Sequence, residues 1–169
     1  EGPQLVLSLG AAPPTPPPLP TEAVIVATLP ATPLNVLTVA ADAWTATAVG
    51  GAPGPKEPLR APGDWSRQAG WELFSGTVRY QATVDLPAAD RLCLDLGQVG
   101  DSALVTIDGR RRGTALWAPY VIDLGPWPRA GSHLLEVEVT NSMANEYEGL
   151  QLPSGLLGPL AACVDTRAE

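Results

Sequence analysis

Two acidic residues in one loop, Glu146 and Glu148, have the type and spacing that sugar-cleaving enzymes use. Such enzymes need two carboxyl groups about 5–5.5 Å or 6.5–9.5 Å apart across the scissile bond. On an extended segment, residues i and i+2 point to the same side and lie roughly 7 Å apart. The pair therefore allows catalysis by a small glycosidase. A solvated acidic loop is the favoured alternative, because no recognisable motif marks either glutamate as an acid or a nucleophile.

A second group of residues could bind a sugar without cleaving it. A pyranose is held by a flat aromatic ring against its apolar face and by polar side chains that reach its hydroxyl groups. Two loops supply such groups, and the candidate ligand-binding residues are Trp117, Tyr120, Asn141, Asn145, Glu146 and Tyr147. The alternative, favoured for any single residue, is structural: the two aromatic residues of the first loop fill the end of a sandwich, and Asn141 caps a strand.

Other chemistry has little support. His133 is the only histidine and opens a strand after "AGS", so we expect an exposed turn residue and not a general base. Ser154 lies in "PSG" and not in a G-x-S-x-G turn, so no Ser-His-Asp triad is indicated. Asp42, Asp95 and Asp101 are isolated, and no nucleotide-binding glycine motif is present. No catalytic residue is therefore assigned.

The charge of the chain and the length of its apolar stretches exclude two classes of partner. The net charge is −8 and Lys56 is the only lysine, whereas nucleic-acid binding needs a dense cationic surface. The one basic run, "GRRRG" (109–113), is expected to be a solvated turn tip. No apolar stretch approaches the roughly 20 residues that span a bilayer. We therefore expect neither a nucleic-acid nor a membrane partner.

The two cysteines leave an alternative open. Cys93 and Cys163 each lie in an apolar, strand-like run, "RLCLDLG" and "LAACVD", and no C-x-x-C motif suggests zinc. They are either small residues of a core or sheet, or a disulfide if their strands are neighbours. The compartment also stays open, with a secreted or periplasmic location favoured.

Hydrophobic alternation predicts an all-β fold. In "TVRYQATVDL" (77–86), every second residue is apolar, and "RLCLDL", "ALVTID" and "HLLEVEV" repeat the pattern. Asp108-Gly109 favours a tight hairpin turn, and no apolar helical repeat extends for three turns. The tryptophans outside the candidate loops are expected to be core or loop plugs; they are Trp44, Trp65, Trp71 and Trp127. The sequence therefore predicts an antiparallel β-sandwich without helices.

The first part of the chain differs from the rest. "APPTPPPLP" (12–20) predicts an extended connector, because proline lacks the N–H that helices and inner strands need. Residues 50–64 are a second Pro/Gly-rich loop, and strands are expected in 22–29 and 34–49. We therefore divide the chain into a Pro-rich segment at 1–33, which is a linker or an added strand, and a sandwich at 34–169. Because it begins with Glu1, we expect a piece of a longer protein.

Residues 63–160 carry a family resemblance in their order of motifs. These are "GDW" (63–65), "LFSGTVRYQATVDLP" (73–87), "RLCLDLGQVGDSALVTIDGRRRGTALWAPYVIDLGPW" (91–127), "AGSHLLEVEVTNSMAN" (130–145) and "PSGLLGPL" (153–160). The segment resembles the galactose-binding-like, jelly-roll sugar-binding domain of family 2 glycoside hydrolases. It is closer still to the terminal β-sandwich of enzymes related to the family 106 α-L-rhamnosidases.

The resemblance implies a non-catalytic accessory domain of a larger glycoside hydrolase whose catalytic domain lies elsewhere. The expected partner is a glycan or a neighbouring catalytic domain of the same chain. No cofactor is expected, although the resemblance allows a structural Ca²⁺ to which no ligands are assigned. A purely structural sandwich that binds no sugar is the main alternative, and a small glycosidase using Glu146 and Glu148 is the third.

Overall fold

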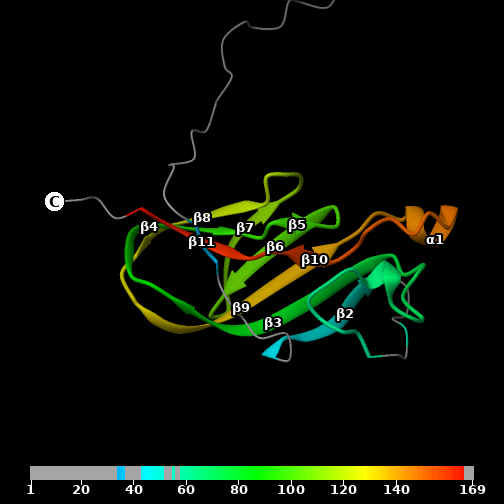
Figure 1. Cartoon of the computed structure of the whole chain (residues 1–169), viewed down its shortest axis with the longest axis horizontal. Coiled ribbons are helices and arrows are strands. Elements are labelled where there is room, and N and C mark those ends of the chain that lie inside the picture. Colours follow the sequence, from blue (N-terminus) through cyan, green and yellow to red (C-terminus); the bar gives the residue numbers. More distant parts are fainter. Residues whose placement is uncertain (1–33, 37–42, 52–54, 56–57, 166–169) are drawn as a thin grey trace, which may run out of the picture.

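The computed structural model of the chain describes residues 34–36, 43–51, 55 and 58–165. The Pro-rich segment 1–33, which includes the predicted strand 22–29, lies outside the described residues, as do 37–42 and Asp42. The described residues form antiparallel sheets stacked into a β-sandwich (Figure 1), which confirms the all-β prediction.

One sheet of the described part has the order β2-β3-β9-β6-β7. Its strands are β2 (Thr45–Gly51), β3 (Gly76–Leu86), β9 (Gly131–Thr140), β6 (Ser102–Ile107) and β7 (Arg110–Ala115). Every neighbouring pair is antiparallel. The predicted hairpin joins β6 to β7, where Asp108 and Gly109 both have positive φ, 51° and 71°. Positive φ at both turn residues is the geometry for which Asp-Gly was recognised.

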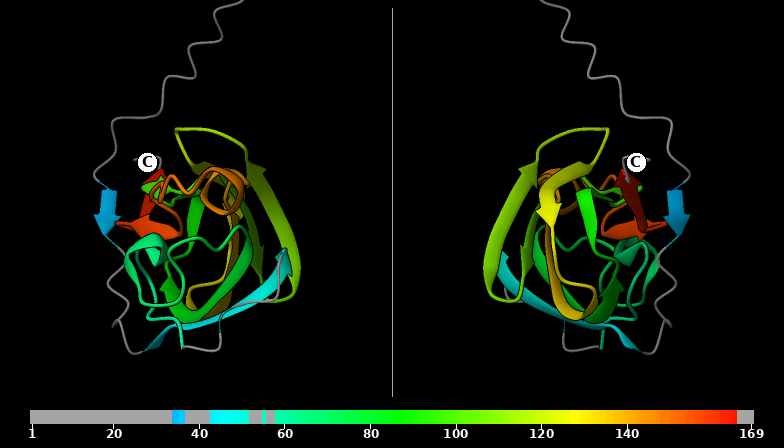
Figure 2. Two further views of the ribbon diagram at one scale, coloured as in Figure 1. Left: turned by 90° about the vertical axis from the view of Figure 1, so that its right-hand side faces the viewer. Right: turned by 90° about the vertical axis from the view of Figure 1, so that its left-hand side faces the viewer.

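The facing sheet has the order β1-β11-β4-β8. Its strands are β1 (Leu34–Val36), β11 (Ala161–Asp165), β4 (Ala89–Asp95) and β8 (Val121–Trp127). A small two-stranded sheet pairs β5 (Gln98–Val99) with β10 (Leu156–Gly158). Seen from its ends in Figure 2, the molecule has its strands arranged around one interior.

The interior is built by the alternation that the sequence predicts. Strand β3 buries every second residue from Val78 to Leu86, and β9 buries Leu135, Val137 and Val139. These side chains belong to a single apolar cluster with residues of β4, β6 and β8. The expected plugs are all buried in the same cluster: Trp44, Trp65, Trp71 and Trp127.

A disulfide joins two strands of the facing sheet. Cys93 of β4 and Cys163 of β11 are direct register partners, with 4.9 Å between their Cα atoms. This distance lies within the usual range for a disulfide. Of the two alternatives that the sequence left open, the structure therefore selects the cross-link.

The expectation of no helices is wrong in detail. Residues Trp65–Arg67 form a 3-10 turn, η2, and Ala144–Glu148 form one helical turn, α1. Each is too short to show a hydrophobic repeat, which is why periodicity could not find it. Asp64 begins η2 by accepting a hydrogen bond from Ser66 N at 3.0 Å. Among the described residues, no helix has the length and apolar character needed to cross a membrane.

Candidate functional site

Sheet register directs the two candidate loops toward the same end of the molecule. Ala103 of β6 pairs with both Ala115, where β7 ends, and Val139, near the end of β9. The loop that carries Trp117 and Tyr120 therefore leaves the sheet beside the segment that follows β9. We call this the α1 end, after the helix that lies furthest out in this direction in Figure 1; the loop between β7 and β8 lies nearer the middle of the molecule.

The side chain of Asn141 stabilises the fold at this end through hydrogen bonds. Its side chain is buried; Oδ1 accepts from Gly76 N at 2.8 Å, and Nδ2 donates to Phe74 O at 3.0 Å and to Ser154 Oγ at 2.9 Å. These bonds tie the end of β9 to the beginning of β3. The side chain thus performs the structural role that we expected as the alternative, which is to cap a strand through bonds to the backbone.

Asn145 holds the returning loop in the same way. Its Oδ1 accepts from Leu152 N at 2.7 Å, and its Nδ2 donates to Leu152 O at 3.0 Å and to Ser154 Oγ at 3.1 Å. Ser154 is itself held by Asp64, whose Oδ1 accepts from Ser154 N at 3.0 Å. The sequence correctly predicted that both amides lie in loops at one end of the sandwich. Their polar atoms, however, bond other groups of the fold and do not point to solvent.

The aromatic candidates are arranged differently. Trp117 and Tyr147 are 70% and 75% exposed, so the expectation that Trp117 fills the sandwich end is wrong. The Tyr120 hydroxyl donates to Asp101 O at 2.9 Å, which anchors its ring beside the β5–β6 turn. Among the described residues, no hydrogen bond or ring contact joins Trp117 to the Asn141–Tyr147 segment. The exposed rings lie on two separate segments, the β7–β8 loop and α1, and do not form one closed site.

The two glutamates are not arranged as the extended geometry required. Both lie on α1, and residues i and i+2 of a helix do not face each other. Glu146 is exposed, and its backbone N–H donates to Ser75 Oγ at 3.1 Å. The assumption of an extended segment was wrong, and the physical reason for pairing these carboxylates is lost with it.

Apolar side chains are exposed around α1. Tyr147 is exposed on α1, and Met143, Leu150 and Leu152 are exposed in the segments that flank it, whereas Leu116 and Trp117 are exposed on the loop between β7 and β8. Large apolar surface left in contact with water typically marks an interaction site. The α1 end therefore has the character of a contact surface, whether the contact is a sugar or another domain.

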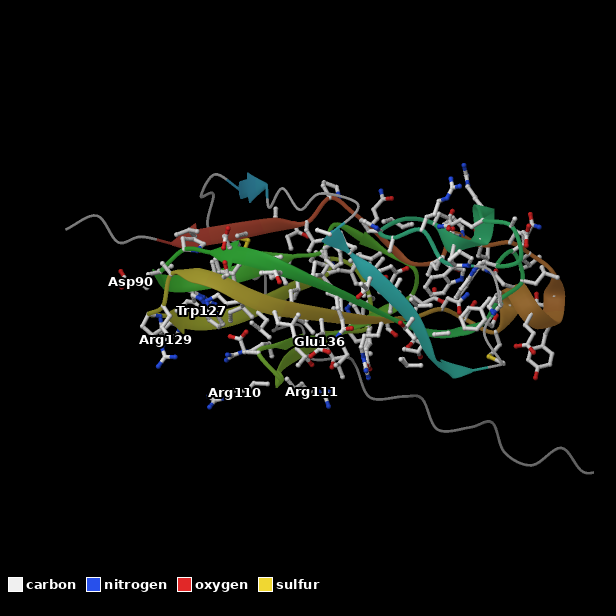
Figure 3. The ribbon with its side chains drawn as sticks, turned by 90° about the horizontal axis from the view of Figure 1, so that it is seen from below. Asp90, Arg110, Arg111, Trp127, Arg129 and Glu136 are labelled. Carbon is white, nitrogen blue, oxygen red and sulfur yellow. A yellow bond between two sulfur atoms is a disulfide. The ribbon has the colours of Figure 1, made fainter. Side chains whose placement is uncertain are left out.

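The opposite end of β9 holds a pocket that the sequence did not predict. It has a volume of about 460 Å³. We call it the arginine pocket; its lining residues are Asp108, Arg110, Arg112, Pro126, Trp127, Pro128, Arg129 and His133. His133 and Asn141 are eight residues apart along the strand, which corresponds to about 27 Å. Figure 3 shows Trp127 and Arg129 at this end, far from α1.

His133 was expected to be exposed, and that expectation is wrong. Its side chain is only 10% exposed and its ring packs edge-on against Trp127, with 5.1 Å between centroids. Nδ1 lies 2.7 Å from Asp108 Oδ2. The expectation that the basic run 109–113 is a solvated turn tip is also wrong for Arg112, because its guanidinium group stacks 4.8 Å from the centre of the Trp127 ring.

Asp108 predicts a measurable pH dependence of stability. The hydrogen bond from His133 and that from Leu134 N hold the pKa of Asp108 below its usual value. A carboxyl group whose pKa is lower in the folded state stabilises the protein at pH values above its unfolded-state pKa of about 3.9. This contribution is lost as the pH falls through the folded-state pKa.

We therefore expect the stability advantage of the natural protein over Asp108→Asn to be present at pH 5 and to shrink below pH 4. Urea midpoints at pH 5 and pH 3 measure it, with Asp90→Asn, an exposed aspartate of β4, as the control. An advantage of equal size at both pH values would contradict the assignment.

Metal binding stays a prediction. Among the described residues, no three His, Cys, Asp or Glu side chains gather in a way that could hold an ion. The structural Ca²⁺ allowed by the resemblance therefore gains no cluster of such side chains in the described part of the chain.

Comparisons with known proteins place the fold among carbohydrate-active enzymes. No family model matches the chain. A Formosa agariphila protein to which the name beta-glucuronidase has been given is 36% identical over 92 residues, which is 50% of this chain and 8% of that protein. A rhamnosidase from Novosphingobium sp. PP1Y superposes with a TM-score of 0.64 and 28% identity, over 80% of this chain and 16% of the enzyme.

A GH2 beta-galacturonidase from Eisenbergiella tayi has the same fold, with a TM-score of 0.57 and 20% identity over 81% of this chain and 26% of that enzyme. The chain thus corresponds to a small part of each of these proteins: 8% of the curated relative and 16–26% of the two solved enzymes. The similarity is to one β-sandwich portion of glycoside hydrolases.

Proposed function

We propose that this chain is a non-catalytic accessory β-sandwich of a larger carbohydrate-active enzyme, and that it contacts carbohydrate. One observation carries the proposal: the rhamnosidase matches 80% of this chain with only 16% of its own length. A portion that small corresponds to one domain of an enzyme that has several. The lost pairing of Glu146 and Glu148 supports the non-catalytic half of the proposal.

The sugar contact is proposed at the α1 end, through its exposed rings. Trp117 and Tyr147 present flat faces to water, and such faces stack on the apolar side of a pyranose. Because the amides of Asn141 and Asn145 are engaged with the fold, polar contacts to the sugar fall to Glu146 and to the free phenol of Tyr147. Two rings with few polar partners predict weak binding.

Docking onto a neighbouring domain of the same polypeptide is the second candidate. It is favoured by the exposed aliphatic residues Met143, Leu150 and Leu152, which are poor sugar ligands but ordinary components of a protein interface. A disulfide is typical of oxidising compartments, which suits either role in a secreted or periplasmic enzyme.

Titration with sugars separates the two candidates. If carbohydrate binds here, calorimetric titration with rhamnose, galactose and uronic-acid oligomers should give saturable heat for at least one of them. Trp117→Ala should weaken that binding by roughly 0.5–1.5 kcal/mol, comparable to one aromatic contact.

For the neutral sugars, Leu134→Ala is the matched control, because it removes an exposed apolar side chain at the opposite end of β9. Absence of heat from the whole panel, in natural and variant protein alike, would reject sugar binding at this end and leave the docking role.

A further inference from the structure

The arginine pocket concentrates positive charge in an acidic protein. The chain carries a net charge of −8, yet three of its ten lysines and arginines line this one cavity. The lining contains a single carboxylate, that of Asp108. With three guanidinium groups against one carboxylate, the pocket attracts anions that the rest of the surface repels.

These arginines lack the carboxylate partners that several other arginines of the described part have. Elsewhere, Arg79 is paired with Glu138 and Arg91 with Asp123, each at 2.6 Å. Among the described residues, Arg110, Arg112 and Arg129 form no ion pair. Their forked donors match a carboxylate or a sulfate and are not already satisfied by one.

Packing holds part of this donor set in place. Arg112 lies over the ring of Trp127, which is only 5% exposed and lines the pocket together with its chain neighbours Pro126 and Pro128. Both the Arg112 Nε and the Trp127 Nε1 are buried and, within the described part, have no hydrogen-bond partner. Buried donors without acceptors are costly, so an anion seated against this wall compensates an existing deficit.

The pocket also contains an acceptor, which a site for a bare anion would not need. Asp108 is 47% exposed, and its carboxylate uses two of its roughly four acceptor positions, for His133 and for Leu134 N. The remaining positions can accept from hydroxyl groups. Donors for an anion beside an acceptor for hydroxyls define a ligand that carries both kinds of group.

We infer that the arginine pocket binds an acidic sugar unit, that is, a hexose bearing a carboxylate or a sulfate ester. The anionic part of the ligand follows from the three unpaired guanidinium groups, and the sugar part rests on the proposed function. A volume of about 460 Å³ is within the range of small-molecule pockets. The site lies at the opposite end of β9 from Trp117, so it is separate from the contact proposed above.

The test follows the indole N–H signals of Trp127 and Trp117 by ¹⁵N NMR, each assigned by substitution to Phe. The folded chain is titrated at constant ionic strength with galacturonate, galactose 6-sulfate, neutral galactose and acetate. The two acidic sugars are expected to shift the Trp127 signal saturably, galactose is not, and acetate is expected to bind at least tenfold more weakly. The tighter of the two acidic sugars identifies the anionic group.

Matched charge variants locate the site. Arg110→Gln and Arg129→Gln remove exposed, unpaired guanidinium groups, and each is expected to weaken the acidic sugar roughly tenfold, as for one charged hydrogen bond. Arg111→Gln is the control: Arg111 leaves the same hairpin in a different direction (Figure 3), bonds Thr114 at 2.7 Å and does not line the pocket.

Four results would overturn the inference: galactose binding as well as galacturonate, acetate binding as well as galacturonate, equal weakening by Arg111→Gln, or no shift at Trp127 with any ligand. A silent Trp127 with a responsive Trp117 would reject only the arginine pocket. Silence at both indoles would reject the proposed sugar binding as well.

Discussion

Replacing both Cys93 and Cys163 with serine is expected to lower the free energy of unfolding by about 4 kcal/mol. The two cysteines are 70 residues apart in sequence, so their bond closes a long loop in the unfolded chain. The entropy that such a loop removes from the unfolded state grows with its length. The bond also joins β11 to β4, the two inner strands of their sheet.

Urea denaturation of the natural protein and of the double serine variant measures this difference. The natural protein with reductant is the control, and its stability should fall to that of the variant, because both lack the cross-link. A difference below about 1 kcal/mol, or a variant that is stable while the reduced natural protein is not, would contradict the role assigned to the disulfide.

Asn141→Ala is expected to destabilise the protein by about 3 kcal/mol. The substitution leaves Gly76 N and Phe74 O without their side-chain partner in a buried site. Each such group carries a penalty of about 1–3 kcal/mol, and here the bonds tie the end of β9 to the start of β3. Loss of these hydrogen bonds should therefore reduce the stability of the protein. Sugar binding should weaken only under conditions in which the variant unfolds.

Thermal and urea unfolding of Asn141→Ala measure the effect. The control is Ser142→Ala, the exposed neighbour, whose Oγ accepts only one long, exposed bond from Ala144 N at 3.4 Å; it is expected to change stability by less than about 0.5 kcal/mol. If Asn141→Ala left the stability unchanged but abolished sugar binding, Asn141 would be a ligand residue after all and the assignment to the fold would be wrong.

The strands could be predicted because alternation reports directly on a sandwich. From Thr77 to Leu86, each second residue is buried as expected, and the Asp108-Gly109 turn fixes the β6–β7 hairpin. The disulfide could not be predicted, because whether β4 and β11 are neighbours depends on long-range topology. Helix α1 was missed because a single turn has no period to detect.

The candidate site was predicted in part. The sequence placed the aromatic and amide residues in two loops, and the fold brings those loops to one end. It could not tell that the amides are consumed by Gly76, Phe74 and Leu152, because those partners come from other segments.

The arginine pocket was missed for the same reason. Its lining comes from residues 108, 110, 112, 126–129 and 133, which only the folded sheets bring together. The available signal was the concentration of arginine beside the Asp108 turn in an otherwise acidic chain.

The most direct test of the central claim, sugar contact without catalysis, records protein amide signals and sugar anomeric signals in one NMR sample containing the chain and an oligosaccharide. We predict saturable shifts of the protein signals while the anomeric signals stay unchanged over days. New reducing-end signals that disappear in Glu146→Gln or Glu148→Gln would show that the chain is a glycosidase and would contradict the account.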